Sequence, residues 1–391
     1  GLSASSTPYV GVVTDANGCT ASISVTITEP AQLAIATSQV NVLCFGNANG
    51  SINATVTGGA TPYNSYAWTK NGSAYATTED ITGLTIGTYL LTVVDDNGCS
   101  FTSSSVTITQ PPLLAASVTA AAAICQNQTA TFTITGTAGD VVTYNINGGS
   151  TATATIGAGG TATVTVANAQ SNTTLNLVSA TNGTCTNNIS GSATQTVYQL
   201  PDVNAVNAQV LCNGATTTAI TFSSTTSIAG TTYPWTNNTP SIGLAASGTG
   251  NIAAFTATNT TTNQVNATIT VTPTANGCAG TPMDVYISVK PTPTLTQVSN
   301  QTFCVGQAMT NGFMSDVYGT TVTWTNSNTA IGIAASGTGD FPNTFLAANS
   351  TNAPITSTIV VTPTVNGCVG NTMSYTITVN PTPTVNAVAN Q

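Results

Sequence analysis

The sequence predicts an all-β protein, a tandem array of antiparallel β-sandwich domains, and two recurring markers indicate this. The first is an Asn-Gly pair followed by a cysteine, at Asp15–Cys19, Asp95–Cys99, Thr181–Cys185, Ala275–Cys278 and Val365–Cys368. Asn-Gly supplies two positive-φ residues for a tight hairpin, so each copy should join two antiparallel strands and place a cysteine at the start of the second. The second marker is a proline one strand later, at Pro30, Pro111, Pro201, Pro291 and Pro381. A spacing of about 90 residues is that of small domains.

These markers divide the chain into repeats. Residues 1–30 match only the end of the span 31–112, so they are expected to be the C-terminal remnant of a repeat. The whole repeats are expected at 31–112, 113–200, 201–291 and 292–381, and are called the first to fourth repeats below. Residues 382–391 should begin a further repeat, because Val385–Val388 reads like Val203–Val206. The sequence is therefore expected to be a window on a longer array.

Alternating side chains predict the strands in order along the chain. Ser22–Thr28 should be the last strand of the remnant, with Ile23, Val25 and Ile27 facing a core. Thr131–Thr135 and Thr161–Val166 should be strands of the second repeat. The third and fourth repeats are copies of one another, since the sequence of Pro234–Gly250 is nearly the same as that of Thr323–Gly339.

Aromatic residues support the sandwich. Tyr89 has the spacing of a tyrosine corner, in which a tyrosine near the start of the penultimate strand bonds back to the preceding loop, and Tyr9 repeats it in the remnant. Trp68 is interpreted as a core residue. The alternative is a sugar-stacking platform formed with Tyr63, Tyr66 and Tyr75.

Eight of the nine cysteines fall two per repeat, which suggests one structural disulfide in each and an oxidising, extracellular location. The predicted pairs are Cys44 with Cys99, Cys125 with Cys185, Cys212 with Cys278, and Cys304 with Cys368. Cys19 is left unpaired, with a partner expected upstream. The alternative is that the cysteines are buried free thiols.

Composition excludes several classes of function. Only 3% of the residues are charged and the net charge is −9, with two basic residues, Lys70 and Lys290, so nucleic acid is not an expected partner. The chain has no histidine, which removes the usual general base and the commonest metal ligand. Its adjacent acids, Glu79-Asp80 and Asp95-Asp96, do not form a catalytic pair, because neighbouring strand residues point to opposite faces. No enzyme activity and no cofactor are expected, apart from the alternative of a weak Ca²⁺ site in residues 31–112. No stretch is apolar and long enough to enter a membrane.

The first repeat resembles a known family. Its CFGNANGSINATVTGG from Cys44, its TEDITGLTIGTYLLTVVDDNGC from Thr78 and its VTITQP ending at Pro111 resemble the SprB repeat of very large surface adhesins of gliding Bacteroidetes. The third and fourth repeats resemble PKD-like, immunoglobulin-related domains that accompany SprB repeats, and the second is interpreted as an immunoglobulin-like or PKD-like domain.

The resemblance implies a bacterial cell-surface location, reached by type IX secretion, and a role as the stalk of a long adhesin filament used in attachment and gliding motility. Partners would be an extracellular surface or polysaccharide bound by other parts of the parent chain, the outer-membrane secretion and motility machinery, and other copies associating laterally or in a filament. The alternative function is an array of carbohydrate-binding modules that uses Trp68, Tyr63 and Tyr66, or Trp235 and Trp324. Proline joints between strands are stiff, so four domains end to end should form an extended rod on the order of 150 Å long.

Overall fold

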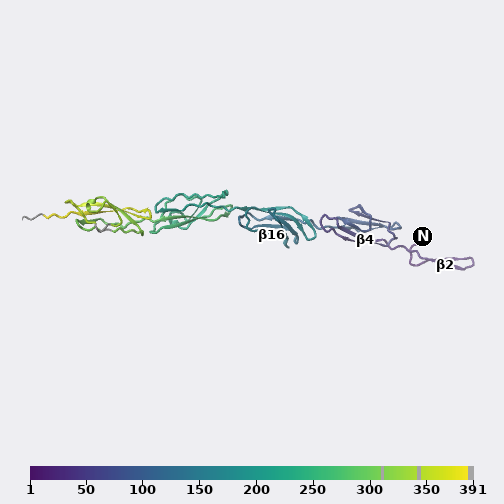
Figure 1. Ribbon diagram of the computed structural model, residues 1–391. Coiled ribbons are helices and arrows are strands. Elements are labelled where there is room, and N and C mark those ends of the chain that lie inside the picture. The colour runs from purple at the N-terminus through teal and green to yellow at the C-terminus, as the bar shows by residue number, and fades with distance from the viewer. Residues whose placement is uncertain (310–311, 341–344, 386–391) are drawn as a thin grey trace, which may run out of the picture. The chain divides into compact units, whose positions relative to one another are not determined.

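The computed structural model describes residues 1–309, 312–340 and 345–385, so most of the expected start of a further repeat lies outside it. The chain falls into two compact units, residues 1–124 with 128–196, and residues 125–127 with 197–391. Strands make up the regular structure (Figure 1). In the described residues the helices are two short 3₁₀ turns, η1 (Pro240–Ile242) and η2 (Thr329–Ile331). The prediction of an all-β chain is confirmed.

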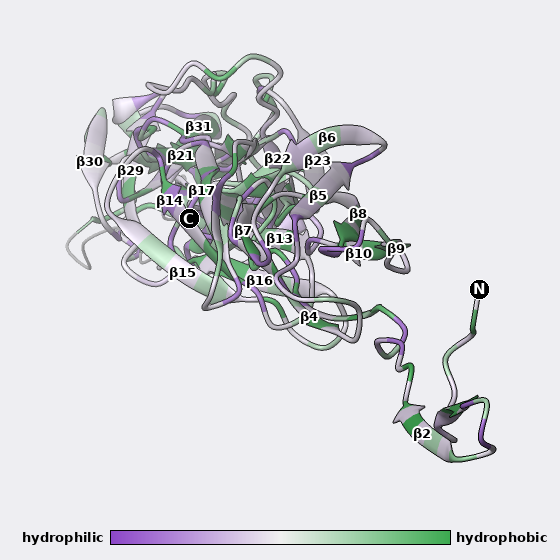
Figure 2. Cartoon of the chain, turned by 90° about the vertical axis from the view of Figure 1, so that its right-hand side faces the viewer, coloured by the Kyte–Doolittle hydropathy of each residue, from purple (hydrophilic) through white to green (hydrophobic). Residues whose placement is uncertain are grey.

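The remnant is a single antiparallel hairpin of β1 (Tyr9–Thr14) and β2 (Thr20–Val25). The Tyr9 hydroxyl donates a hydrogen bond to the Ser3 carbonyl oxygen at 3.0 Å. Ile23 and Val25 are 66% and 50% exposed, so the prediction that they face a core is wrong for this chain. Among the described residues the two strands pair only with each other, and no second sheet covers the apolar residues of β2, which are green in Figure 2.

The first repeat is a sandwich of two sheets. One sheet has the order β3 (Ala34–Val40), β4 (Gly50–Thr57), β7 (Ile81–Leu84). The other has the order β10 (Val106–Ile108), β8 (Gly87–Val94), β5 (Ser65–Lys70), β6 (Ser73–Ala76), with β9 (Ser100–Thr102) also paired to β8. Trp68 and Tyr89 lie between the sheets, and the Tyr89 hydroxyl donates to the Thr85 carbonyl oxygen at 2.9 Å. The predicted tyrosine corner is confirmed.

The second repeat has a three-stranded and a five-stranded sheet. The first contains β11 (Ala116–Ala120), β13 (Ala130–Gly136) and β16 (Thr161–Val166). The second contains β15 (Thr151–Thr155), β14 (Val141–Ile146), β17 (Thr173–Thr181), β18 (Thr186–Asn188) and β19 (Ser192–Gln195). Two short strands, β12 (Ile124–Cys125) and β20 (Val197–Tyr198), lie where the two compact units meet in the sequence. Both strands predicted for this repeat, β13 and β16, are present and pair with each other.

The third and fourth repeats have the same sheet order, as the similarity of their sequences predicts. The third contains β21 (Gln209–Cys212), β27 (Met283–Lys290), β24 (Val265–Val271), β22 (Pro234–Asn237) and β23 (Ser247–Thr249), with the pair β25 (Thr274–Ala275) and β26 (Cys278–Ala279). The fourth contains β28 (Gln301–Cys304), β33 (Met373–Asn380), β31 (Ile355–Val365), β29 (Thr321–Asn326) and β30 (Ser336–Thr338), with β32 (Cys368–Val369) paired to β31.

One strand pairing matters for the cysteines. The first strand of the third repeat runs parallel to the last strand, with Cys212 opposite Lys290. The fourth repeat repeats this, with Cys304 opposite Asn380. In both repeats the first cysteine therefore lies at the C-terminal end of the sandwich.

The Asn-Gly turns join antiparallel strands as predicted, but they are of two kinds. In the third and fourth repeats both residues have positive φ, at 52° and 76° for Asn276 and Gly277. In the first repeat only Gly98 of the turn does, and the turn is closed by the side chain of Asp95. In the first repeat, a hydrogen bond to the Asp95 carboxylate thus closes the turn without an asparagine of positive φ.

Candidate functional site: disulfides between successive repeats

Three disulfides join cysteines of different repeats. They are Cys44–Cys185, Cys125–Cys278 and Cys212–Cys368, each with its Cα atoms 5.6 Å apart. Cys19, Cys99 and Cys304 are free thiols. The predicted pairs within repeats, Cys44 with Cys99, Cys125 with Cys185, Cys212 with Cys278, and Cys304 with Cys368, are therefore wrong. Each bond instead joins the first cysteine of one repeat to the turn cysteine of the next repeat in the sequence.

The two cysteines of one repeat lie at opposite ends of the sandwich, which explains the correction. Cys212 lies beside the last residue of β27, at the C-terminal end. The turn that carries Cys278 lies at the N-terminal end, where the Pro201 carbonyl oxygen is only 1.7 Å from the position that a Cβ atom on Gly280 would take. A strand of eight residues such as β27 separates the two ends by about 25 Å. A disulfide needs Cα atoms within about 7 Å.

The first cysteine of each repeat begins a tight turn, and this turn is called the cysteine loop below. The residue two positions after the cysteine has a positive φ, at 76° for Gly46, 71° for Asn127, 84° for Gly214 and 86° for Gly306. Asn47 N donates to the Cys44 carbonyl oxygen at 3.1 Å, and Gln307 N donates to that of Cys304 at the same distance. The sequence pattern Cys-x-Gly or Cys-x-Asn marks these turns and is the signal that could have predicted them.

The cysteine loop of the first repeat is fixed to the residues that directly follow β10, the last strand of its own repeat. Gly46 N donates to Gln110 Oε1 at 2.9 Å, and Val42 N donates to the Thr109 carbonyl oxygen at 2.9 Å. Cys44 is thereby presented at the C-terminal end of its sandwich, beside the chain that leads into the second repeat.

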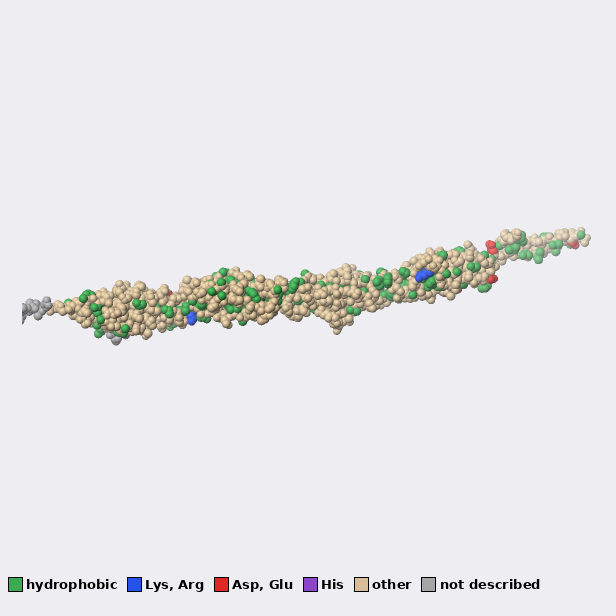
Figure 3. Space-filling view, turned by 90° about the horizontal axis from the view of Figure 1, so that it is seen from above, with side chains coloured by type: hydrophobic (Ala, Val, Ile, Leu, Met, Phe, Trp, Pro, Cys, Tyr) green, Lys and Arg blue, Asp and Glu red, His purple; other side chains and the backbone are tan. Residues whose placement is uncertain are grey.

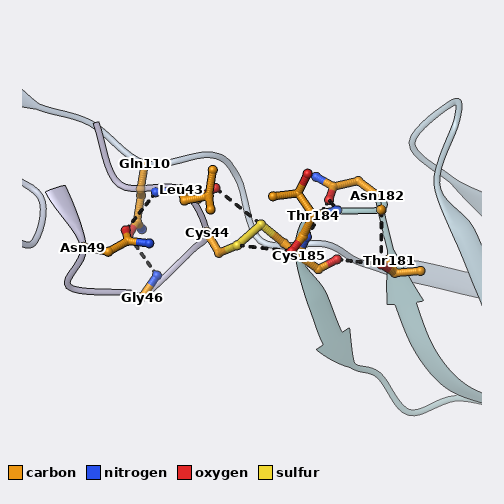
Figure 4. Close-up of a disulfide and its surroundings, with 10 residues drawn as sticks. Leu43, Cys44, Gly46, Asn49, Gln110, Thr181, Asn182, Thr184 and Cys185 are labelled. Carbon is orange, nitrogen blue, oxygen red and sulfur yellow. Dashed lines mark hydrogen bonds between the residues drawn. A yellow bond between two sulfur atoms is a disulfide. The ribbon is translucent and has the colours of Figure 1, made fainter. Parts of the chain in front are cut away.

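The partner cysteine is held by the turn of the second repeat (Figure 4). Asn182 Oδ1 accepts a hydrogen bond from Cys185 N at 2.8 Å, and the Thr181 hydroxyl donates to the Cys185 carbonyl oxygen at 2.8 Å. The Cys185 sulfur lies 3.3 Å from the Leu43 carbonyl oxygen of the preceding repeat. The bond thus forms between two backbone segments that are each fixed by hydrogen bonds of their own repeat.

The Cys212–Cys368 disulfide has an additional polar contact beside it. Lys290, the last residue of β27, donates from Nζ to the carbonyl oxygen of Asn366 at 3.0 Å. Asn366 lies in the turn that carries Cys368, and Asn213, next to Cys212, donates from N to the Lys290 carbonyl oxygen at 2.9 Å. One of the two basic residues of the chain therefore connects the end of the third repeat to the turn of the fourth.

The aromatic residues proposed for sugar stacking do not form an open platform. Trp68, Trp235 and Trp324 are 1%, 8% and 3% exposed. Trp68 Nε1 donates to the Thr78 carbonyl oxygen at 3.0 Å, and the rings of Tyr63 and Tyr66 stand at 89° to each other. A Cβ atom on Gly337 would lie 2.2 Å from the Trp324 ring, so this indole is packed directly on the backbone of β30.

The described residues carry little that could bind a charged ligand. Uncharged polar side chains and backbone cover most of the face in Figure 3, with few acidic or basic groups. In residues 1–309, 312–340 and 345–385 there is no group of three or more cysteine and carboxylate side chains that could hold a metal ion. A groove of about 740 Å³ lies in the fourth repeat between residues 313–323 and 338–340, and Trp324 is not among its lining residues. None of the described helices is long and apolar enough to span a bilayer.

Asp95 should make the first repeat sensitive to acid. Its carboxylate accepts hydrogen bonds from Ala60 N at 2.9 Å, Cys99 N at 2.8 Å and Asn97 N at 3.1 Å, and these bonds hold the pKa of Asp95 below its ordinary value. A lowered folded-state pKa gives stability that is present above the unfolded value, about 3.9, and is lost as the pH falls through the folded value. We expect Asp95→Asn to destabilise the first repeat at pH 7 and to flatten its loss of stability below about pH 4.

Hydrogen-exchange mass spectrometry of peptides from residues 31–112 measures this effect. Asp15→Asn is the matched control, because Asp15 makes the same turn bonds to Asn17 N and Cys19 N in an exposed hairpin. An unchanged acid dependence of the first repeat in Asp95→Asn would contradict the assignment.

Comparisons with known proteins find two families in parts of the chain. The sequence profile of the SprB repeat matches residues 36–73, and that of the PKD-like domain matches residues 209–293 and 301–383. The chain contains an SprB repeat and two PKD-like domains in these residues. These families indicate a cell-surface adhesive repeat region of structural type, and with the disulfides they indicate an extracellular location. No curated protein matches the SprB and PKD-like chain.

Several solved structures align with the chain at low similarity. An adhesin stabilised by Ca²⁺, with which an Antarctic bacterium binds ice, is 20% identical over 88% of the SprB and PKD-like chain and 99% of its own, with a TM-score of 0.36. Immunoglobulin domains 1–5 of Sidekick-1 are 12% identical over 88% of the chain and 77% of their own, with a TM-score of 0.27. Extracellular cadherin domains 3–6 of protocadherin gamma B2 are 10% identical over 88% and 98%, with a TM-score of 0.29.

Proposed function

We propose that residues 1–391 are a load-bearing section of the stalk of a long, secreted bacterial adhesin filament that serves surface attachment and gliding motility. The observation that carries the proposal is the covalent bond between successive repeats. Binding of a surface or polysaccharide would be the task of other parts of the parent chain, and the outer-membrane secretion and motility machinery would be its partner at the cell.

The disulfides create a short covalent route through each compact unit. In the first and second repeats the route follows residues 31–44, crosses to Cys185 and continues along residues 185–200. In the second unit it follows residues 201–212, crosses to Cys368 and continues along residues 368–381. Each repeat of about 90 residues is crossed by only about 12 to 16 residues of this route.

This route limits how far the stalk can stretch. A released repeat of about 90 residues would extend to roughly 300 Å, at 3.3–3.6 Å per residue. A crossing of about 14 residues extends to roughly 50 Å, which is close to the length of a folded strand with its loops. Tension between the ends of a repeat is therefore borne by covalent bonds, and opening of the sandwich adds only roughly 10–20 Å, against more than 200 Å for a released repeat.

The Cys125–Cys278 disulfide begins a second covalent route of the same form. Residues 278–290 lead from Cys278 to the end of the third repeat, and residues 292–304 then lead to Cys304 in the fourth. In the third repeat the two routes are the parallel strands β21 and β27, which are hydrogen-bonded to each other. The two strands that carry load thus run side by side along the direction of pull.

Small-angle X-ray scattering of the oxidised chain tests the stalk proposal. A compact globule of 391 residues would have a radius of gyration of about 20 Å. A rod on the order of 150 Å long would have about 40 Å, and we expect the larger value. A radius near 20 Å would contradict the proposal.

The alternative function is an array of carbohydrate-binding modules. Burial of Trp68, Trp235 and Trp324 argues against it, since a stacking platform needs an exposed ring face.

A further inference from the structure

A cavity lies beside the free thiol of Cys99 in the first repeat. It measures about 390 Å³ and is lined by residues 29–33, where the chain enters the repeat, and by the turn and strand from Asp95 to Phe101. Cys99 is exposed at this site.

The second repeat has a cavity at the corresponding place, and there it is nearly filled. Its walls are residues 111–114, where the chain enters the repeat, and residues 182–187 of the turn hairpin. Cys44 and Phe45 of the preceding cysteine loop form the rest of the lining, and only about 50 Å³ of space remains. The same pair of walls is thus seen once with a cysteine loop seated and once without.

The turns that carry Cys99 and Cys185 are closed by the same kind of hydrogen bond. Cys99 N donates to Asp95 Oδ1 at 2.8 Å, and Cys185 N donates to Asn182 Oδ1 at 2.8 Å. Once bonded, the turn cysteine becomes buried, with exposed fractions of 8% for Cys185 and 1% for Cys278 and Cys368.

We infer that the cavity beside Cys99 is a docking site for the cysteine loop of another repeat of this kind, and that Cys99 forms a disulfide with the cysteine of that loop. The occupant is a Cys-x-Gly or Cys-x-Asn turn whose cysteine and middle residue line the cavity, as Cys44 and Phe45 do in the second repeat. Forming the bond removes two protons and two electrons from the two thiols, and a disulfide oxidant such as glutathione disulfide takes them up as two thiols. The inference rests on the geometry of the disulfides and extends the proposed stalk by one further linkage.

Cys304 is the matching donor of such a loop. Its loop has a positive-φ glycine, Gly306, and is closed by a hydrogen bond from Gln307 N to the Cys304 carbonyl oxygen, as the loop of Cys44 is closed by Asn47 N. The Cys304 thiol is exposed. A repeat of this kind can therefore present a reactive loop at one end and a receiving turn at the other.

The test uses a peptide of residues 41–49, with the thiol of Cys44 activated as a thiopyridyl mixed disulfide. Attack by a protein thiolate on the peptide sulfur forms the new disulfide and releases thiopyridone. The 391-residue chain, with its three disulfides intact, is treated with this peptide and, separately, with dithiodipyridine. Mass spectrometry then gives the rate of labelling at Cys19 and at Cys99.

Cys19 is the internal control, because it has the same turn and the same 2.8 Å bond from its backbone N to an aspartate but does not line the cavity. We expect the ratio of Cys99 to Cys19 labelling to be at least tenfold higher with the peptide than with dithiodipyridine. A peptide with serine in place of Phe45 should lose most of this preference.

Equal ratios for the two reagents would overturn the inference. If they are equal while the three disulfides between repeats are found by mapping, only the docking site at Cys99 is wrong and the stalk proposal stands. Loss of the disulfides themselves would instead contradict the stalk proposal.

Discussion

Pulled from its two ends, the oxidised chain should extend no further than about 200 Å between residues 31 and 381, because about 55 residues make up its shortest covalent route. After reduction the same span should extend to about 1,200 Å, in steps of roughly 300 Å as each repeat unfolds. Single-molecule force spectroscopy with and without a reductant measures both values.

A double variant, Cys212→Ser with Cys368→Ser, isolates one bond. The shortest route must then return through the second repeat to Cys125 and cross to Cys278, so the maximum extension of the oxidised chain should rise about threefold. Cys304→Ser is the matched control, since Cys304 is a free thiol outside the route, and it should leave the extension unchanged. Full unfolding steps in the oxidised wild-type chain would refute the load-bearing route.

Trp68→Ala should cause the largest loss of folding stability of any single aromatic substitution in the first repeat. The indole is 1% exposed and lies between the two sheets, and truncation of a buried tryptophan costs about 3–5 kcal/mol. Hydrogen exchange of residues 31–112 in increasing denaturant reports this loss.

Tyr75→Ala provides the comparison, because Tyr75 is 42% exposed in the same repeat. If Trp68 is a core residue, Tyr75→Ala should lose much less folding stability than Trp68→Ala. Neither the wild-type chain nor either variant should then bind saccharides. Saccharide binding on a glycan array that falls in both variants, with the fold intact, would favour the carbohydrate-binding alternative.

Local patterns in the sequence were enough to predict the sandwich elements. Strict alternation placed β13 and β16, and the spacing of Tyr89 from its preceding loop predicted the bond to the Thr85 carbonyl oxygen. These features depend on residues close in sequence, so the sequence contains the information directly. Ile23 was placed wrongly, because its burial depends on a second sheet, and the part of the chain that the structure describes provides none for β1 and β2.

The cysteine pairs could not be predicted in the same way. Two cysteines per repeat satisfy pairing within a repeat and pairing between repeats equally well. The choice depends on the parallel pairing of the first and last strands, which places Cys212 opposite Lys290 and far from Cys278. That pairing is a long-range property of the sheet. The Cys-x-Gly and Cys-x-Asn turns could have marked Cys44, Cys125, Cys212 and Cys304 as one class of cysteine, but not their partners.

Disulfide mapping of the unreduced chain tests the central claim most directly. Trypsin would leave the cysteines unresolved, because the chain has only two basic residues, so a protease such as pepsin is required. We expect linked peptides that join Cys44 to Cys185, Cys125 to Cys278 and Cys212 to Cys368, each separating into two after reduction. Linked peptides that join Cys44 to Cys99, or Cys212 to Cys278, would contradict the claim that the bonds connect successive repeats.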